Sequence, residues 1–276
     1  MSRLRAVFRH LPRFALATLF LLPLFWMFTA SLRQPGLPPP RTVEWWPAAP
    51  HWDNYVTIFR IIPMARYVLN SAIVVAIAVP ITLLTASTAG FSLSQLDDSR
   101  RRRILTISVV LLMIPGASVW LFRFQILRWL NLIDSLWSLI IPAFAAGNPL
   151  FVLLFFWTYR RVPGEIFEAA QLDGAGAIST WWRIARPLAR PTAAGVILLA
   201  FAAYWSDFAS PILYIYRPDL YTLPVGLQIL KQIDATNWPL LLAAAVVATA
   251  PVIVLFVSIQ RAFLDNLSLS SLVEEP

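Results

Sequence analysis

The sequence contains no cysteine and only two histidines, and these absences remove several kinds of chemistry. Without cysteine there is no disulfide, thiolate zinc site, iron–sulfur cluster or cysteine nucleophile. His10 and His51 lie near the N-terminus and in a proline-rich segment, so we expect neither a histidine metal site nor a Ser-His-Asp triad. The chain also lacks the Gly-x-x-x-x-Gly-Lys-Ser/Thr phosphate-binding loop. We therefore expect no metal and no cofactor on this chain.

The composition is strongly apolar. Of 276 residues, 59% are hydrophobic and 13% charged, and the mean hydropathy is +0.69. An ordinary cytosolic globule is excluded by these values. Stretches of about 20 mostly uncharged residues, the length that crosses a bilayer as helix, occur six times. The predicted spans are residues 14–32, 68–94, 104–122, 136–159, 191–215 and 238–260.

These stretches predict an all-α polytopic membrane protein with one transmembrane domain over residues 1–276. Prolines within the spans are compatible with helix, because neighbouring helices can satisfy the freed carbonyls in a bilayer. Strands are not expected, since the apolar runs are continuous and do not alternate. The first run could be a cleaved signal peptide, but its 19 apolar residues exceed a signal core, so a retained span is favoured.

The basic residues predict the orientation. The net charge is +8, and every basic residue except Lys231 is arginine. Fourteen of the 22 lie before the first span, in the second-to-third and fourth-to-fifth loops, and after the sixth span. This bias places both termini in the cytoplasm. The run Arg100–Arg103 is interpreted as a positive-inside anchor beside membrane lipid rather than a nucleic-acid patch.

Segment 34–63 is rich in proline and tryptophan and is expected outside the membrane. Tryptophan gathers at membrane interfaces, so a surface anchor is the favoured interpretation. A contact surface for an external partner is the alternative.

The fourth-to-fifth loop, residues 163–190, has the signals of two short helices. Pro163 can open a helix, Glu165 and Glu168 suit its N-terminal half, and Gly174 can supply the left-handed residue that ends it. A second short helix is expected near residues 179–185. Helices of about two turns are marginal in water, so this loop is expected to dock onto its own membrane domain or onto a soluble partner.

The spacing of this loop resembles the cytoplasmic signature of the permease subunits of ABC importers. Glu-Ala-Ala is followed at the family's spacing by Asp-Gly-Ala and then by two prolines, in the loop and topology where the family has them. In that family the short helix fits a groove on the nucleotide-binding subunit and transmits its ATP-driven closure. The resemblance assigns ATPase coupling to Glu168, Ala169, Ala170, Asp173, Gly174, Ala175 and Pro187.

Other segments resemble the carbohydrate-uptake branch of this family, the six-span permeases similar to the maltose-system subunit. They are Asn54-Tyr55, Asn70-Ser71, Met113-Ile114-Pro115, Leu223-Pro224-Val225-Gly226-Leu227, and Gln260 with Phe263. Three departures leave the sugar open. Trp205-Ser206-Asp207 stands where the branch has Trp-Asn, and the tail after Asp265 lacks the common Gly-Ala-Val-Lys-Gly ending. The second-to-third loop reads Ser94-Gln95-Leu96-Asp97-Asp98 instead of the usual Ala-Arg sequence.

The resemblance implies a transmembrane permease subunit of a bacterial inner-membrane importer for a sugar or oligosaccharide. It implies two ATP-binding subunits that bind ATP and Mg, a second permease and an extracytoplasmic solute-binding protein. A permease for another polar solute, such as a polyamine or glycerol phosphate, is the alternative within the family. A secondary transporter is disfavoured because no inverted repeat or carboxylate cluster is visible. A membrane enzyme is disfavoured because the spans hold no histidine or cysteine.

Four residues are candidates for the solute path. An acid within a span usually faces water or a bundle interior, so Asp207 either lines the passage with Tyr204 and Trp205 or lies at the outer, hydrated end of the span. The outer end is slightly favoured, because about 16 residues precede Asp207 after Pro191. Asn148, between Gly147 and Pro149, could mark an unwound turn on the path or an irregularity of helix packing.

Overall fold

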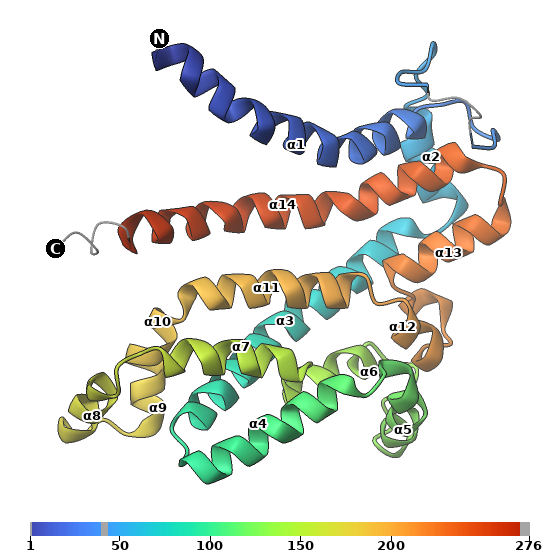
Figure 1. The fold of residues 1–276 in the computed structure, drawn as a ribbon. Helices are drawn as coiled ribbons and strands as arrows, with labels where there is room; N and C mark the ends of the chain where they lie inside the picture. The colour runs from blue at the N-terminus through green and yellow to red at the C-terminus, as the bar shows by residue number, and fades with distance from the viewer. Residues whose placement is uncertain (1, 40–43, 271–276) are drawn as a thin grey trace. The chain divides into compact units, whose positions relative to one another are not determined.

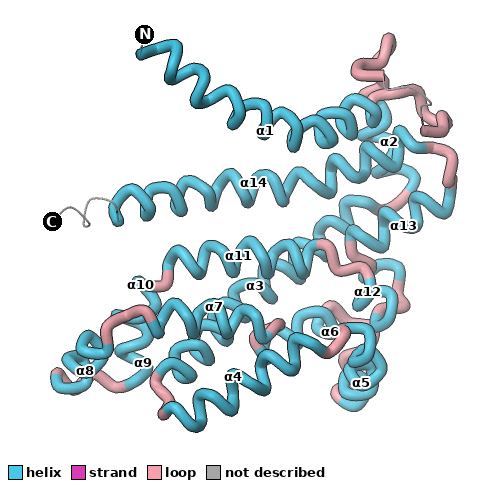
Figure 2. The backbone as a smooth tube through the Cα atoms, in the orientation of Figure 1, coloured by secondary structure: helices cyan, strands magenta, loops and turns pink. Residues whose placement is uncertain are grey.

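Helices make up the regular secondary structure of the described chain. The computed structural model describes residues 2–39 and 44–270, and the side chains of residues 14–39 and 44–260. Within these ranges Figure 2 shows helices joined by turns and loops, without a strand. The all-α prediction is confirmed for these residues. Arg41, one of the basic residues assigned to the outer side, lies outside them.

The elements follow one another in the order labelled in Figure 1. They are α1 (Ser2–Ser31), α2 (Asp53–Ile61), α3 (Met64–Ser94), α4 (Asp98–Met113), α5 (Gly116–Trp129), α6 (Trp137–Ile140), the 3₁₀ turn η1 (Ile141–Ala145), α7 (Pro149–Arg160), α8 (Gly164–Leu172), α9 (Ala177–Thr180), the π-helical turn η2 (Trp181–Ala185), α10 (Arg186–Leu188), α11 (Arg190–Trp205), α12 (Ala209–Tyr214), the 3₁₀ turn η3 (Pro218–Leu220), α13 (Leu223–Ile233) and α14 (Trp238–Ser270).

Four stretches of the described chain are long and apolar enough to cross a membrane as helix. They are Phe14–Ser31, Met64–Ser94, Trp137–Arg160 and Trp238–Gln260, which overlap the first, second, fourth and sixth predicted spans. Two helix pairs reach the required length only when joined. These are Asp98–Met113 with Gly116–Trp129, bent by 100°, and Ala177–Leu188 with Arg190–Trp205, bent by 82°.

The third predicted span, residues 104–122, is therefore not one straight helix. α4 ends at Met113 and α5 begins at Gly116. Ile114 is extended at φ −74° and ψ 121°, as expected of a residue before proline, and Pro115 cannot donate to the helical ladder. The fifth predicted span, 191–215, is also interrupted, because α11 ends at Trp205 and α12 begins only at Ala209.

The chain forms two compact units, one of residues 1–65 with 226–251 and one of residues 66–225 with 252–276. In the first unit, Asn54 ties the end of α1 to α2. Its amide donates to the carbonyls of Ser31 and Arg33, each at 2.8 Å, while the hydroxyls of Ser31 and Tyr55 lie 2.7 Å apart. Asn54 is 2% exposed, so the Asn-Tyr segment noted in the sequence holds the fold together here.

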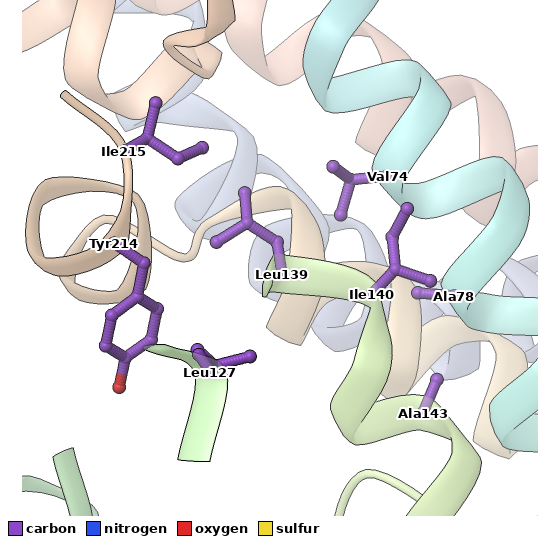
Figure 3. Packing of buried hydrophobic residues seen from close by; sticks show 8 residues of the cluster. All are labelled: Val74, Ala78, Leu127, Leu139, Ile140, Ala143, Tyr214 and Ile215. Atoms are coloured by element: carbon purple, nitrogen blue, oxygen red, sulfur yellow. The ribbon is translucent and has the colours of Figure 1, made fainter. Parts of the chain in front are cut away.

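The second unit contains the hydrophobic core shown in Figure 3. Its members come from α3, α5, α6, η1 and the end of α12, which are far apart in the sequence. They are Val74, Ala78, Leu127, Leu139, Ile140, Ala143, Tyr214 and Ile215. The core therefore packs α5, α6, η1 and the end of α12 around the middle of α3.

The Asn-Ser pair at the start of α3 holds the segment that precedes α13. The Asn70 amide donates to the carbonyls of Asp219 and Tyr221, each at 2.9 Å, and the Ser71 hydroxyl accepts from the backbone N–H of Leu223 at 2.9 Å. Arg217 hydrogen-bonds the exposed Asp219 carboxyl at 2.7 Å and lowers its pKa. The Asn70-Ser71 pair therefore serves the stability of the fold.

Helices α3 and α7 come into close contact at Gly90. A Cβ atom at this position would lie 2.7 Å from the Cβ of Phe155 and 2.9 Å from the backbone nitrogen of Phe156. Only glycine fits such a contact without a shift of one helix.

Candidate functional site

Helix α8 is the first of the two short helices expected in the loop of residues 163–190. It begins after Pro163, whose φ of −54° and ψ of 134° are extended, and carries Glu165 in its first turn. At its end the N–H of Gly174 donates to the carbonyl of Gln171 at 3.0 Å, and that of Ala175 to Ala170 at 2.9 Å. These two bonds form a Schellman cap around Gly174. Its φ is +79°, so the left-handed conformation predicted from the sequence is confirmed.

One face of α8 packs on the chain itself and the other is exposed. Phe167 and Ala170 are 4% and 6% exposed, whereas Leu172 is 89% exposed. Glu168, Ala169 and Asp173 are also exposed. The two alanines of the motif thus lie on different faces, and only Ala169 is available to a partner.

Aromatic rings attach the buried face of α8 to the membrane helices. Phe167 meets Phe91 of α3 edge to face, with ring centroids 5.6 Å apart and an interplanar angle of 71°. Phe91 in turn meets Tyr159 of α7 at 5.6 Å and 85°. Such edge-to-face pairs add to the free energy gained by burying the rings. The short helix therefore persists because it is docked, as its length requires.

A buried hydrogen-bond network attaches the second part of the loop. The hydroxyls of Ser87 on α3 and Tyr159 on α7 lie 2.7 Å apart, and the indole N–H of Trp181 donates to Ser87 at 3.1 Å. Ser87 is 4% exposed, Tyr159 1% and Trp181 7%. No pattern in the sequence singled out these residues. The sequence could have indicated Phe167 as a docking residue, because it lies three residues before Ala170 and therefore on the same face of the helix.

The second short helix runs from Ala177 to Leu188 through α9, η2 and α10, and is longer than the predicted 179–185. Its middle turn, η2, is π-helical. Pro187 lies in α10 and is exposed. From there the chain turns by 82° into α11.

A polar cavity lies at the other end of α7. The start of this helix, the turn before it and the end of α11 surround about 200 Å³. Figure 1 shows α8 and α9 beyond one end of α7 and α6 beyond the other. The polar residues of the lining are Arg123, Ser138, Asn148, Tyr204, Asp207 and Ser210.

Three of the four residues predicted for the solute path line this cavity. The hydroxyl of Tyr204 lies 3.1 Å from that of Thr82 on α3. The Asp207 carboxylate accepts from the backbone N–H of Ser210 at 3.1 Å, and the side-chain Oδ1 of Asn148 caps α7 by accepting from the N–H of Leu150 at 2.9 Å. These bonds orient the three side chains.

Gly147 makes room for this arrangement. Its φ is +65°, and a Cβ atom would lie 3.0 Å from the Tyr204 hydroxyl. Both the left-handed backbone and the close contact favour glycine here. The irregular turn before α7 therefore belongs to the wall of the cavity.

One residue differs from the prediction. Trp205 is absent from the lining and is 7% exposed, with its ring stacked on Phe201 at 5.4 Å and 16°. Arg123, which the sequence did not single out, also reaches the cavity, because α5 turns by 100° after the bend at Pro115. Asp207 lies beyond the end of α11 and is half-buried. The cavity thus offers guanidinium and amide donors and a carboxylate acceptor, the groups that bind a polyhydroxylated solute.

Comparison with known proteins decides the family. Residues 78–268 match the family described as "Binding-protein-dependent transport system inner membrane component". The chain belongs to this family. The matched region holds most of α3, the loop of residues 163–190 and the polar cavity.

Curated relatives and solved structures extend this result. The sulfoquinovosyl glycerol transport system permease protein SmoH of Agrobacterium fabrum is 29% identical over 252 residues, which cover 91% of this chain and 88% of that protein. The arabinooligosaccharides permease AraQ of Halalkalibacterium halodurans is 30% identical over 78% of this chain and 77% of its own. A chain of a bacterial ABC transporter that imports the acidic polysaccharide alginate matches with a TM-score of 0.74 at 20% identity, covering 95% of this chain and 97% of that one. This last likeness shows the fold.

Proposed function

We propose that this chain is a permease subunit of an ATP-driven importer that takes up a sugar or oligosaccharide. The observation that carries the proposal is the family match over residues 78–268, together with relatives named for sugar-containing solutes. ATP and Mg bind to two separate subunits, a second permease completes the pore, and an extracytoplasmic solute-binding protein delivers the solute. Both termini lie in the cytoplasm of a bacterial cell.

The coupling role falls to α8 and its cap. Glu168, Ala169, Ala170, Asp173, Gly174, Ala175 and Pro187 are the residues proposed for it. The docked side of α8 supports the role, because a force on its exposed side reaches α3 and α7 through Phe167. The exposed apolar side chain of Leu172 is suited to packing against an ATP-binding subunit.

The solute path falls to the polar cavity. Asp207, Tyr204 and Asn148 are proposed to contact hydroxyl groups of the solute, with Arg123 as an added donor. Trp205 stays in the proposal as a packing residue behind this wall. A permease for a polyamine or glycerol phosphate is the second candidate from the sequence. The cavity does not favour a polyamine or glycerol phosphate, since its lining carries one cation and one carboxylate.

The test is co-purification. The tagged chain is extracted gently from its native membrane, and its partners are identified by mass spectrometry. We expect an ATP-binding protein, a second permease and, after cross-linking, a solute-binding protein. Leu172→Gln should lose much of the ATP-binding protein. Val56→Gln, which likewise replaces an exposed apolar side chain by glutamine, at a residue 51% exposed on α2, should retain it. A chain that is recovered alone and transports without ATP would refute the proposal.

A further inference from the structure

A second pair of cavities lies beside η2, away from the polar cavity. The first, of about 270 Å³, and the second, of about 410 Å³, share Leu83, Trp182, Arg186 and Ala193. We call the two together the tryptophan groove. Its remaining lining residues that matter here are Leu84, Phe155, Arg190 and Ile197.

The walls of the groove are those of a surface in contact with hydrocarbon. Leu84 and Trp182 are 51% and 52% exposed, and most of the residues that line the first cavity are apolar. Phe155 lies five residues before Arg160, where α7 ends, a rise of about 7 Å along the helix. Arg190 immediately precedes the charge-free part of α11. The groove is therefore level with the boundary between hydrocarbon and headgroups.

The mouth of the groove is positively charged. The Arg186 guanidinium lies 4.0 Å from the centroid of the Trp182 ring, a cation–π contact. Arg186 and Arg190 form no ion pair with any residue whose side chain the structure describes, and no carboxylate lines either cavity. Two arginines with no counter-ion among the described side chains, above an apolar cleft, complement a ligand with a negative head and an apolar tail.

We propose that the tryptophan groove binds an anionic phospholipid. The phosphate lies between Arg186 and Arg190, and one acyl chain runs along Leu83, Leu84 and Phe155. Basic pockets at the membrane boundary bind lipid headgroups in this way, and tryptophan favours the same level. A protein surface fits less well, because it would have to supply carboxylates to two arginines at the hydrocarbon edge. The site is independent of the proposed transport function.

The location of the groove allows a bound lipid to act on the turn between α8 and α11. Trp182 follows Trp181, which donates to Ser87, and both belong to η2 between α8 and α11. A lipid in the groove therefore packs against the turn that leads from the coupling loop into the next span. An anionic lipid is expected to stabilise this turn in the conformation described here.

The first test measures lipid bound to the purified protein, with whatever subunits it retains. Native mass spectrometry follows exchange of phosphatidylglycerol and phosphatidylcholine in Arg186→Gln/Arg190→Gln and in the control Arg160→Gln/Arg161→Gln. The control pair is exposed at the end of α7 and removes the same charge. We expect phosphatidylglycerol affinity to fall roughly fivefold for each groove arginine removed and to change less than twofold in the control. Equal loss in both variants would overturn the proposal.

The second test locates the lipid in the wild-type protein and does not depend on the charge variants. Brominated phosphatidylglycerol and phosphatidylcholine are compared as quenchers of tryptophan fluorescence in vesicles of equal bromolipid content. The anionic lipid should quench more, and Trp182→Phe should remove the excess. If the excess is unchanged in Trp182→Phe, or if neither lipid reaches Trp182 because the second permease covers it, the proposal is wrong.

Discussion

Phe167 of α8 packs edge to face on Phe91 of α3, and this contact joins a nine-residue surface helix to a membrane helix of 31 residues. Phe167 is 4% exposed, whereas the side chains on the opposite face of α8 are open. The docked face gives α8 the stability that its length alone does not supply.

Phe167→Ala is expected to loosen α8 with little effect on the rest of the fold. Truncation of a buried phenylalanine costs about 3–5 kcal/mol, which here falls on one short helix. ATP hydrolysis by the complex should continue while uptake falls, so the two rates are measured together in proteoliposomes. Phe167→Leu keeps most of the volume and should retain coupling. Normal uptake in the alanine variant would contradict the assigned contact.

Gly174 offers a second test of the coupling role proposed for the loop of residues 163–190. Its φ is +79°, and a Cβ atom at this position would meet no neighbouring atom within 4 Å, so a substitution there causes backbone strain without a clash. Gly174→Val should cost about 1–3 kcal/mol and reduce co-purification of the ATP-binding subunit. Gly176→Val is the control, because Gly176 has a φ of −69° and equally open space. If the two variants behaved alike, the left-handed backbone conformation of Gly174 would not be needed for association with the ATP-binding subunit.

Ser87 is predicted to hold the second part of the loop in place. Ser87→Ala leaves the buried Tyr159 hydroxyl without its Ser87 bond and the Trp181 indole N–H without its acceptor. We expect a loss of about 1–3 kcal/mol, seen as a lower melting temperature in detergent. Ser92→Ala, at an exposed position of the same helix, should leave it unchanged. Equal melting temperatures for both variants would show that the network adds no stability.

Asp207→Asn tests the polar cavity. The amide oxygen can still accept from Ser210, so local structure is kept while the charge is removed. A charge-assisted hydrogen bond to solute is worth about 1.5–3 kcal/mol, so uptake should fall about tenfold or more at low solute concentration. Asp53→Asn, an exposed acid on α2, serves as control. Unchanged uptake would remove Asp207 from the solute path.

Local signals predict much of this architecture. Length and hydropathy place the long helices, and the left-handed turn at Gly174 follows from a glycine at the end of a helical run. The bend at Pro115 is visible in the sequence as a proline, yet its 100° angle is not. Prolines are tolerated in membrane helices, so hydropathy alone favours a straight span.

Contacts between distant segments are what the sequence does not reveal. Arg123 reaches the cavity only because α5 turns back, and Trp205 faces away although it adjoins Tyr204. Neighbours on a helix point about 100° apart, so one of two adjacent aromatics lines a cavity while the other packs behind it. Phe91 and Phe167 are 76 residues apart and carry no joint signature in one sequence.

The close contact at Gly90 gives α7 a point about which the helix can tilt. Phe155, the residue in contact, lies near the middle of a helix that begins at the cavity and ends at the loop of residues 163–190. About 10 Å of helix lies on the cavity side and about 7 Å on the loop side. A tilt about Gly90 therefore moves the two ends in opposite directions, by about 1–2 Å each for a tilt of about 10°. Inward pressure on α8 is therefore expected to displace Asn148 outward, and the distances from a label at each end of α7 to a reference label on α3 should change with opposite signs.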